Sequence, residues 1–151
     1  MAAQHLSEAE WELFRRMQPA DQRHSVQVLR TLLEAGVADE DLLKAALLHD
    51  VGKSRCRIGV VHRTVAVLLQ VLFGELPPFA YQRRGAWWMP FHVLANHPRI
   101  GAAMLSQAGS PERVWRLVEL HQQDPRFAGT GPDSRWLTEA LIVLRGADNE
   151  N

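Results

Sequence analysis

The sequence predicts an all-α protein, folded as a compact helical bundle. Apolar residues recur at helical spacing in several stretches, most clearly from Leu42 to His49. Helix-start signals such as the Ser7-Glu8-Ala9-Glu10 capping box precede these stretches, and glycines such as Gly36 follow them. No stretch shows sustained period-two alternation of β-branched residues with hairpin turns, so a β-sheet is not expected.

Composition limits the size and the partners of the protein. The chain has 151 residues, 46% of them hydrophobic, which suits one domain with a proper core. We therefore expect a single domain over residues 1–151, with its core at about 20–149. Lys plus Arg and Asp plus Glu both number 17, so the formal net charge is zero. Without a global positive field, DNA binding is not expected.

Three further features indicate a cytoplasmic protein. Cys56 is the single cysteine, which excludes an intramolecular disulfide and a Cys-rich zinc site. The first residues carry acids early and lack the basic and apolar regions of a secretory signal. The longest apolar run, Val65 to Phe73, is far shorter than the roughly 18 residues of a spanning helix, so we expect a core helix and no membrane span.

The first two helices have clear boundaries. The capping box at Ser7 starts a helix that runs to about Met17, where Pro19 separates it from the next. The second helix is expected from Ala20 to Ala35. His24 lies on it beside the apolar stripe.

The third helix carries the most informative pair of residues. Asp39 is expected to cap it. In the stretch from Leu42 to Lys53, the apolar helical run ends in adjacent His49 and Asp50, followed by Val51-Gly52-Lys53. Helical periodicity turns both side chains toward the core. Because a buried carboxylate is costly without a cationic partner, the pair indicates either a satisfied core pair or a metal site.

The middle of the chain is less regular. A helix is expected from Ile58 to Phe73, followed by an irregular insertion at about 75–91 that is rich in proline. The insertion contains Trp87-Trp88 and Arg83-Arg84. It is predicted to be a packed loop whose tryptophans bury against the bundle, and the alternative is a cover over a substrate pocket.

The last three helices each place a polar residue toward the core. Pro98 suits the first helical position, so His97 is predicted to be the N-cap of a helix that runs to Gly109. His121 ends the apolar stripe of the following helix. After a loop over 122–133, the last helix begins at Ser134 and aims Asp148 at the core.

Several imidazoles and two carboxylates on apolar faces are hard to bury without cations. Imidazole and carboxylate ligands suit Fe, Mn, Zn, Co or Ni, and six ligands suffice for two ions that share a carboxylate. A water shared by two such ions would be the nucleophile in hydrolysis. The predicted metal ligands are His24, His49, Asp50, His97, His121 and Asp148.

Candidate substrate contacts lie next to these ligands in the sequence. Lys53 could bind a phosphate as a point charge or could be a solvated lysine. Arg23 and Arg99 adjoin ligands and could do similar work, although arginines on amphipathic helices are more often surface residues. The remaining histidines are expected to be structural or exposed; they are His5, His62 and His92.

The order of His24, His49-Asp50 and Asp148 resembles that of the HD-domain superfamily of metal-dependent phosphohydrolases. The resemblance extends from about Asp21 to Asn149 and includes the motif LLHDVGK. It implies that Asp50 is a bridging catalytic carboxylate and that Lys53 contacts substrate phosphate. The surroundings of His97 and His121 resemble members with binuclear sites, which implies that these two bind the second ion.

The sequence also departs from known subfamilies. The HD-GYP enzymes carry two adjacent histidines and a later Gly-Tyr-Pro, whereas here Gln122 follows His121 and the loop reads FAGTGP, which argues against cyclic di-GMP as the substrate. Members with a third ion add a glutamate where this chain has Ala20, so three ions are not expected.

Three functions remain open from the sequence. The first is a phosphohydrolase that cleaves a phosphomonoester or phosphodiester, with nucleotides among the candidate substrates. The second is a di-iron oxygenase, since some oxygenases resemble the same fold and ligand pattern. The third is a non-catalytic, metal-containing module that senses a nucleotide or partner. Whether the protein forms a homodimer is left open.

Overall fold

Helices follow one another along the described part of the chain, as the sequence predicts. A computed structural model describes residues 2–73, 85, 88–127 and 131–151. Within these ranges there is no strand. The α-helices are α1 (Glu8–Arg15), α2 (Pro19–Glu34), α3 (Glu40–Leu48), α4 (Val60–Phe73), α6 (Met89–Gln107), α7 (Glu112–Leu120) and α8 (Ser134–Asn149). Short 3₁₀ helices are η1 (Ala2–Gln4), η2 (Val51–Arg55) and η3 (Pro125–Phe127).

The predicted helix starts at Ser7 and Asp39 are confirmed. Ser7 Oγ accepts a hydrogen bond from the Glu10 main-chain N–H, and Glu10 Oε2 accepts one from the Ser7 N–H. Asp39 Oδ1 accepts the N–H of Leu42 at the start of α3. These bonds satisfy donors that the first turn of a helix leaves unpaired.

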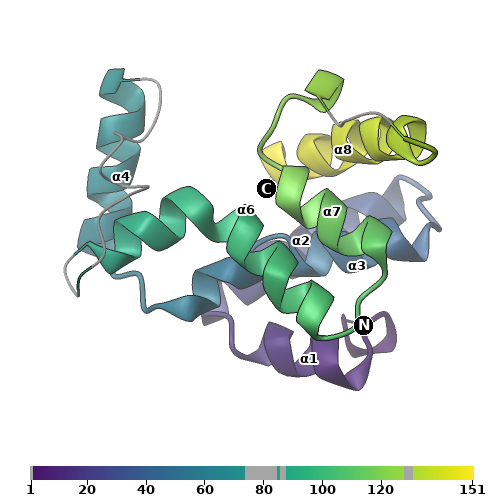
Figure 1. Ribbon diagram of the computed structural model, residues 1–151, viewed down its shortest axis with the longest axis horizontal. Helices are drawn as coiled ribbons and strands as arrows, with labels where there is room; N and C mark the ends of the chain where they lie inside the picture. Colours follow the sequence, from purple (N-terminus) through teal and green to yellow (C-terminus); the bar gives the residue numbers. More distant parts are fainter. Residues whose placement is uncertain (1, 74–84, 86–87, 128–130) are drawn as a thin grey trace.

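Helix α3 lies in the middle of the bundle and contacts α1, α2, α7 and α8 (Figure 1). Its residues 45–48 are fully buried. The α-helix ends at Leu48 with His49 as C-cap, close to the predicted end of the helical run at His49 and Asp50, and the chain then tightens into η2. A Cβ on Gly52 would lie 2.1 Å from the His97 carbonyl oxygen. The missing side chain of Gly52 therefore allows close backbone contact between η2 and α6.

The predicted start of the His97 helix is wrong. Helix α6 begins at Met89, with Pro90 in its first turn, so His97 and Pro98 lie inside the helix. A proline within a helix leaves the carbonyl four residues earlier without its usual N–H donor. Here that carbonyl belongs to Leu94, and it accepts a hydrogen bond from the His97 ring nitrogen Nδ1 at 2.7 Å. The ring N–H of His97 thus satisfies the carbonyl that Pro98 leaves without a donor, and α6 continues through Pro98.

Helix α4 is not the core helix that the sequence predicts. It extends from one end of the molecule, and contacts α6 (Figure 1). Ala66 is buried against Phe91, but Val61, Val71 and Leu72 are 65%, 76% and 72% exposed. Among the described residues, no helix combines the length and apolar character needed to cross a membrane.

Most of the predicted insertion over 75–91, including Arg83, Arg84 and Trp87, lies outside the described residues. Its last three residues belong to α6 instead. Trp88 lies beside Phe91, with ring centroids 6.1 Å apart.

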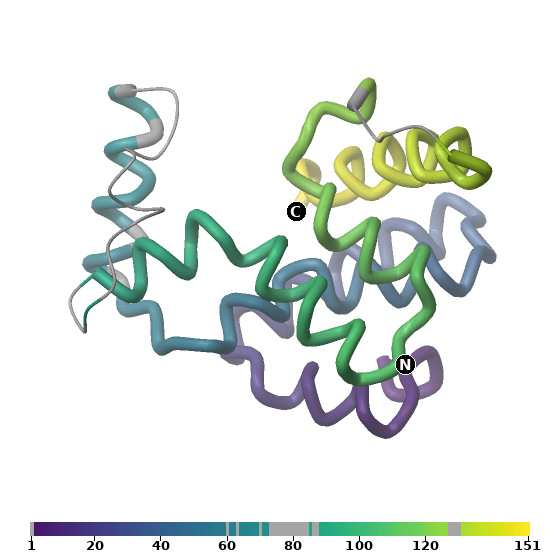
Figure 2. Tube along the Cα trace, viewed as in Figure 1, coloured from purple at the N-terminus to yellow at the C-terminus, as the bar shows by residue number. Residues whose placement is uncertain are grey.

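The C-terminal part of α8 returns to the centre of the bundle. The chain trace shows the end of α8 next to the end of α7 (Figure 2). Arg145 Nη1 donates a hydrogen bond to the Gln123 carbonyl oxygen just beyond α7, and Asn151 donates to Thr31 Oγ1 on α2. This path brings Asp148 beside α2 and the end of α3.

Candidate metal centre

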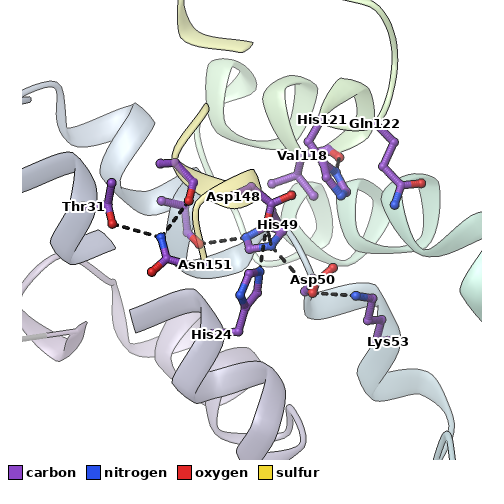
Figure 3. A network of polar contacts seen from close by, with 12 residues as sticks. His24, Thr31, His49, Asp50, Lys53, Val118, His121, Gln122, Asp148 and Asn151 are labelled. Carbon is purple, nitrogen blue, oxygen red and sulfur yellow. Dashed lines mark hydrogen bonds and ion pairs between the residues drawn. The ribbon is translucent and has the colours of Figure 1, made fainter. Parts of the chain in front are cut away.

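The six predicted ligands converge on one place. They form two groups, and within each group the potential ligand atoms all lie within 4.8 Å of one another. Helices α2 and α8 supply His24 and Asp148, and the end of α3 supplies His49 and Asp50. The first group is His24, His49 and Asp148, and the second is Asp50, His97 and His121. Figure 3 shows His24, His49 and Asp148 close together, with Asp50 beside them.

Three of the histidines are oriented by the same kind of hydrogen bond, from the ring Nδ1 to a main-chain carbonyl oxygen three residues earlier. Nδ1 of His49 lies 2.9 Å from the Ala46 carbonyl oxygen, and Nδ1 of His121 lies 2.7 Å from the Val118 carbonyl oxygen. Both histidines are helix C-caps, next to carbonyls that lack an intrahelical donor. His97 makes the equivalent bond to the carbonyl that Pro98 leaves free. Because a carbonyl only accepts, Nδ1 carries the hydrogen, and each Nε2 is turned toward the site.

Asp50 lies between the two groups. Its Oδ2 is 3.6 Å from Nε2 of His49, and its Oδ1 is 3.3 Å from Nε2 of His97. Lys53 Nζ lies 2.6 Å from Oδ2. His49, Asp50, His97 and His121 are each exposed by no more than 4%. The carboxylate is therefore buried, with one oxygen directed to each group.

The His24 side of the cluster is more open. His24 Nε2 donates a hydrogen bond of 2.7 Å to Asp148 Oδ1, and Nε2 of His49 lies 3.5 Å from the same oxygen. The side chains of His24 and Asp148 are 28% and 33% exposed. Solvent thus reaches the site along this side.

The electrostatics of the carboxylates favour their charged forms. Burial acts to raise the pKa of Asp50, but the charge of His49, a hydrogen bond from His97 and the charge of Lys53 outweigh it, and the pKa lies well below its usual range. Hydrogen bonds from His24 and His49 lower the pKa of Asp148. Both side chains are therefore carboxylates at neutral pH.

The histidines differ from one another. Burial acts to lower the pKa of His49, but Asp50 and Asp148 raise it above its usual value. Burial, together with the charges of His49 and His97, lowers the pKa of His121 to about 3. His121 is thus neutral at physiological pH, which is the form that binds a metal.

This donor set fits metal ions. In each group, imidazole nitrogens and carboxylate oxygens lie within 4.8 Å of one another. Such an arrangement is unfavourable unless protons or cations lie between them. Imidazole and carboxylate donors match borderline divalent ions, and the Nδ1 bonds to carbonyls are the outer contacts that usually orient metal-binding histidines.

The predicted substrate residues have different placements. Lys53 adjoins the cluster through Asp50. Arg23 lines a surface cleft of about 430 Å³ with Phe14 and Arg30, and Arg99 lines one of about 670 Å³ with Trp115. None of the six cluster residues lines either cleft. Adjacency in a helical sequence turns a side chain by about 100° away from its neighbour, which explains why the arginines point elsewhere.

The other histidines lie outside both groups of potential ligands. His5 pairs with Glu40 at 3.1 Å. The ring of His62 lies 5.4 Å from that of Phe91, and His92 lies next to Asn96. This placement agrees with the structural or exposed role that the sequence suggests for them.

Sequence reasoning missed three residues that shape the site. Gly52 and Gly101 form the close crossing between η2 and α6, where a Cβ on Gly101 would lie 3.2 Å from the Gly52 nitrogen. Gln122 places its amide nitrogen 3.3 Å from Nε2 of His97. The only available signal was position: Gly52 comes two residues after Asp50, Gly101 one helical turn after His97, and Gln122 directly after His121.

Comparisons with known proteins identify the family. Searches of curated proteins and of solved structures found no match. A sequence model of the HD domain matches residues 22–150, which is most of the chain and includes all six cluster residues. The protein therefore belongs to the HD-domain family.

Proposed function

We propose that this protein is a phosphohydrolase that cleaves a small phosphomonoester or phosphodiester with two divalent transition-metal ions. The observation that carries the proposal is the position of Asp50, whose two oxygens face His49 in one group and His97 in the other. A carboxylate in this position is suited to bridge two cations. Membership of the HD-domain family supports metal-dependent hydrolase-type chemistry.

In this proposal the first ion is held by His24, His49 and Asp148, and the second by His97 and His121, with Asp50 shared. When bound, the two ions supply a nucleophilic water at neutral pH and neutralise charge on the phosphoryl group. The neutral state of His121 and the charged state of Asp50 mean that little proton release is needed at these two ligands.

Lys53 is the residue that we assign to the substrate phosphate. Its ammonium group lies 2.6 Å from Asp50 Oδ2, and its side chain is 19% exposed, so it borders both the cluster and solvent. An ammonium group binds phosphate as a compact point charge. Removal of the charge by Lys53→Met should weaken substrate binding and raise KM for a phosphate ester.

The experiment is reconstitution of the metal-free protein with Mn, Fe, Co, Ni or Zn, followed by assays on phosphomonoesters, phosphodiesters and nucleotides. We expect hydrolysis that Asp50→Asn abolishes. The matched control is Asp41→Asn, which changes a carboxylate in the first turn of α3, at the end away from Asp50, and should leave turnover near the wild-type rate.

A metal-replete protein that is inert on the whole panel refutes the proposal. Substrate-dependent oxygen uptake by the iron-loaded protein would instead indicate an oxygenase. A metal-dependent rise in Tm without any turnover would indicate a binding module.

A further inference from the structure

Gln122 contacts the metal-facing side of His97. It follows His121 at the end of α7, and its side chain is exposed. Its Nε2 nevertheless lies 3.3 Å from Nε2 of His97, a residue that is 2% exposed. Figure 3 shows Gln122 at the edge of the cluster next to His121. Gln122 therefore lies at the boundary between solvent and the second group of potential ligands.

The direction of this hydrogen bond follows from the other nitrogen of His97. When His97 is neutral, as a metal ligand must be, the proton is on Nδ1, which donates to the Leu94 carbonyl. Nε2 then presents a lone pair, and Gln122 Nε2 is the donor. The Gln122 amide thus uses the same lone pair that a metal ion at the second group would take. Once a cation occupies that lone pair, the amide N–H needs a new acceptor near the same point.

The two groups also differ in the number of protein ligands that they offer. The second group has Asp50, His97 and His121, whereas the first has three ligands of its own and faces the other oxygen of Asp50. An ion at the second group therefore keeps more positions for water or substrate. Gln122 adjoins this group, so an oxygen that binds there is the natural acceptor for its amide.

From these contacts we infer that Gln122 is a substrate-positioning residue, whose Nε2 donates a hydrogen bond to a phosphoryl oxygen bound at the Asp50, His97 and His121 group. The inference rests on the proposed phosphohydrolase function. Gln122 does not ligate the metal, because the amide nitrogen, which has no free lone pair, is the atom that faces the site. Lys53 and Gln122 then supply one charged and one neutral donor to the phosphate.

Three variants test the role of Gln122. Gln122→Ala removes the donor, and Gln122→Glu replaces it with a carboxylate of the same shape that can bind metal and repels phosphate. The matched control is Gln123→Ala, because Gln123 is the exposed neighbour that hydrogen-bonds to Leu120 and Arg145 through its main chain. Each protein is stripped of metal and titrated with Mn²⁺ by calorimetry, and the loaded protein is then titrated with inorganic phosphate.

For Gln122→Ala we expect Mn²⁺ affinities within about threefold of wild type and phosphate affinity weaker by about tenfold, as the loss of one hydrogen bond to a charged group implies. Gln122→Glu should bind one Mn²⁺ more tightly than wild type and bind phosphate still more weakly than Gln122→Ala. The control should match wild type in both titrations.

Two results overturn the inference while the proposed function stands. If Gln122→Ala loses one Mn²⁺ or weakens its binding tenfold, Gln122 is a ligand. If phosphate affinity is unchanged in Gln122→Ala, the amide does not reach the phosphate. Wild-type protein that binds no Mn²⁺ overturns the inference together with the metal site on which it depends.

Discussion

His121 combines a buried ring with a low affinity for protons. Its Nδ1 is bound to a carbonyl, and its Nε2 faces the other imidazoles of the cluster. A proton on Nε2 would be both desolvated and close to positive charge, which explains a pKa of about 3. The ring is therefore kept in its metal-binding form across the physiological range.

The metal-free protein should lose stability as the pH falls, in part through His121. The folded pKa of His121 is about 3 and the unfolded value is about 6.5, so between these values the unfolded chain binds the proton and the folded one does not. Relative to about pH 7, the part of the free energy of unfolding that His121 contributes should fall by about 2 kcal/mol at about pH 5. Chemical unfolding at about pH 7 and pH 5 measures it.

The other titrating groups of the cluster affect the stability over different pH ranges. The pKa values of Asp50 and Asp148 are lowered in the folded protein, so these groups stabilise it above about pH 4, and this stability is lost as the pH falls. The pKa of His49 is raised, so this group stabilises the folded protein below about pH 6.5, and this stability is lost as the pH rises. His121→Gln serves as the comparison, because it removes only the His121 contribution. An equal pH dependence in this variant and in wild type would contradict our account of His121.

Some residues of the cluster can be predicted from the sequence alone, and others cannot. His49, His121 and Asp148 can be found from sequence because each ends or continues an apolar helical stripe. The environment of His97 cannot, because Pro98 suggests a helix start and only the position of the whole helix shows that it frees a carbonyl. Arg23 and Arg99 were suggested by adjacency in sequence, which in a helix does not mean a shared face.

At the scale of elements, the crossing of η2 and α6 positions the second group of potential ligands. Gly52 and Gly101 let the two backbones approach, which places Asp50 opposite His97. Helix boundaries are harder to predict from sequence than helix existence. The tightening of the chain into η2 and the early start of α6 at Met89 both accompany contacts between segments that are distant in sequence.

Gly52→Ala should be severely destabilising. Its new Cβ would lie 2.1 Å from the His97 carbonyl and 2.8 Å from the Gly101 nitrogen, and both are backbone atoms. We expect a loss of more than about 3 kcal/mol in the free energy of unfolding, measured with denaturant.

The control for this substitution is Gly146→Ala in α8. A Cβ there meets nothing within 4 Å, so the helical preference for alanine should stabilise the protein by about 0.5 kcal/mol. If Gly52→Ala unfolds at the same denaturant concentration as wild type, the close crossing is not a feature of the protein in solution.

Pro98→Ala should weaken metal binding without removing a ligand. Alanine restores an N–H that can donate to the Leu94 carbonyl and compete with Nδ1 of His97. Loss of such an outer contact weakens metal affinity by roughly tenfold. Competition with a chromophoric chelator measures the affinity, and Pro90→Ala in the first turn of the same helix should leave it unchanged. Equal weakening in both variants would argue against this role for Pro98.

On the scale of the whole molecule, the cluster joins parts of the chain that are far apart in sequence. Its potential ligands come from α2, the end of α3, α6, the end of α7 and α8. An ion bound only by the folded state would therefore stabilise the bundle by mass action. Helix α4 and its exposed apolar residues lie outside this arrangement.

Metal loading should raise Tm. At a free metal concentration about a hundred times Kd, the gain is about 3 kcal/mol, or roughly 5 to 10 °C for a chain of this size. Thermal unfolding with metal and with chelator measures the difference. Asp50→Asn should show a smaller difference than wild type, because its amide cannot bridge two ions as a carboxylate does.

The number of metal ions bound per chain tests the binuclear site most directly. Elemental analysis of the reconstituted protein should find two ions per chain in the wild type, and fewer in Asp50→Asn. Wild-type protein without stoichiometric metal, or the same metal content in both proteins, would contradict the assignment of Asp50 as the shared carboxylate of two metal ions.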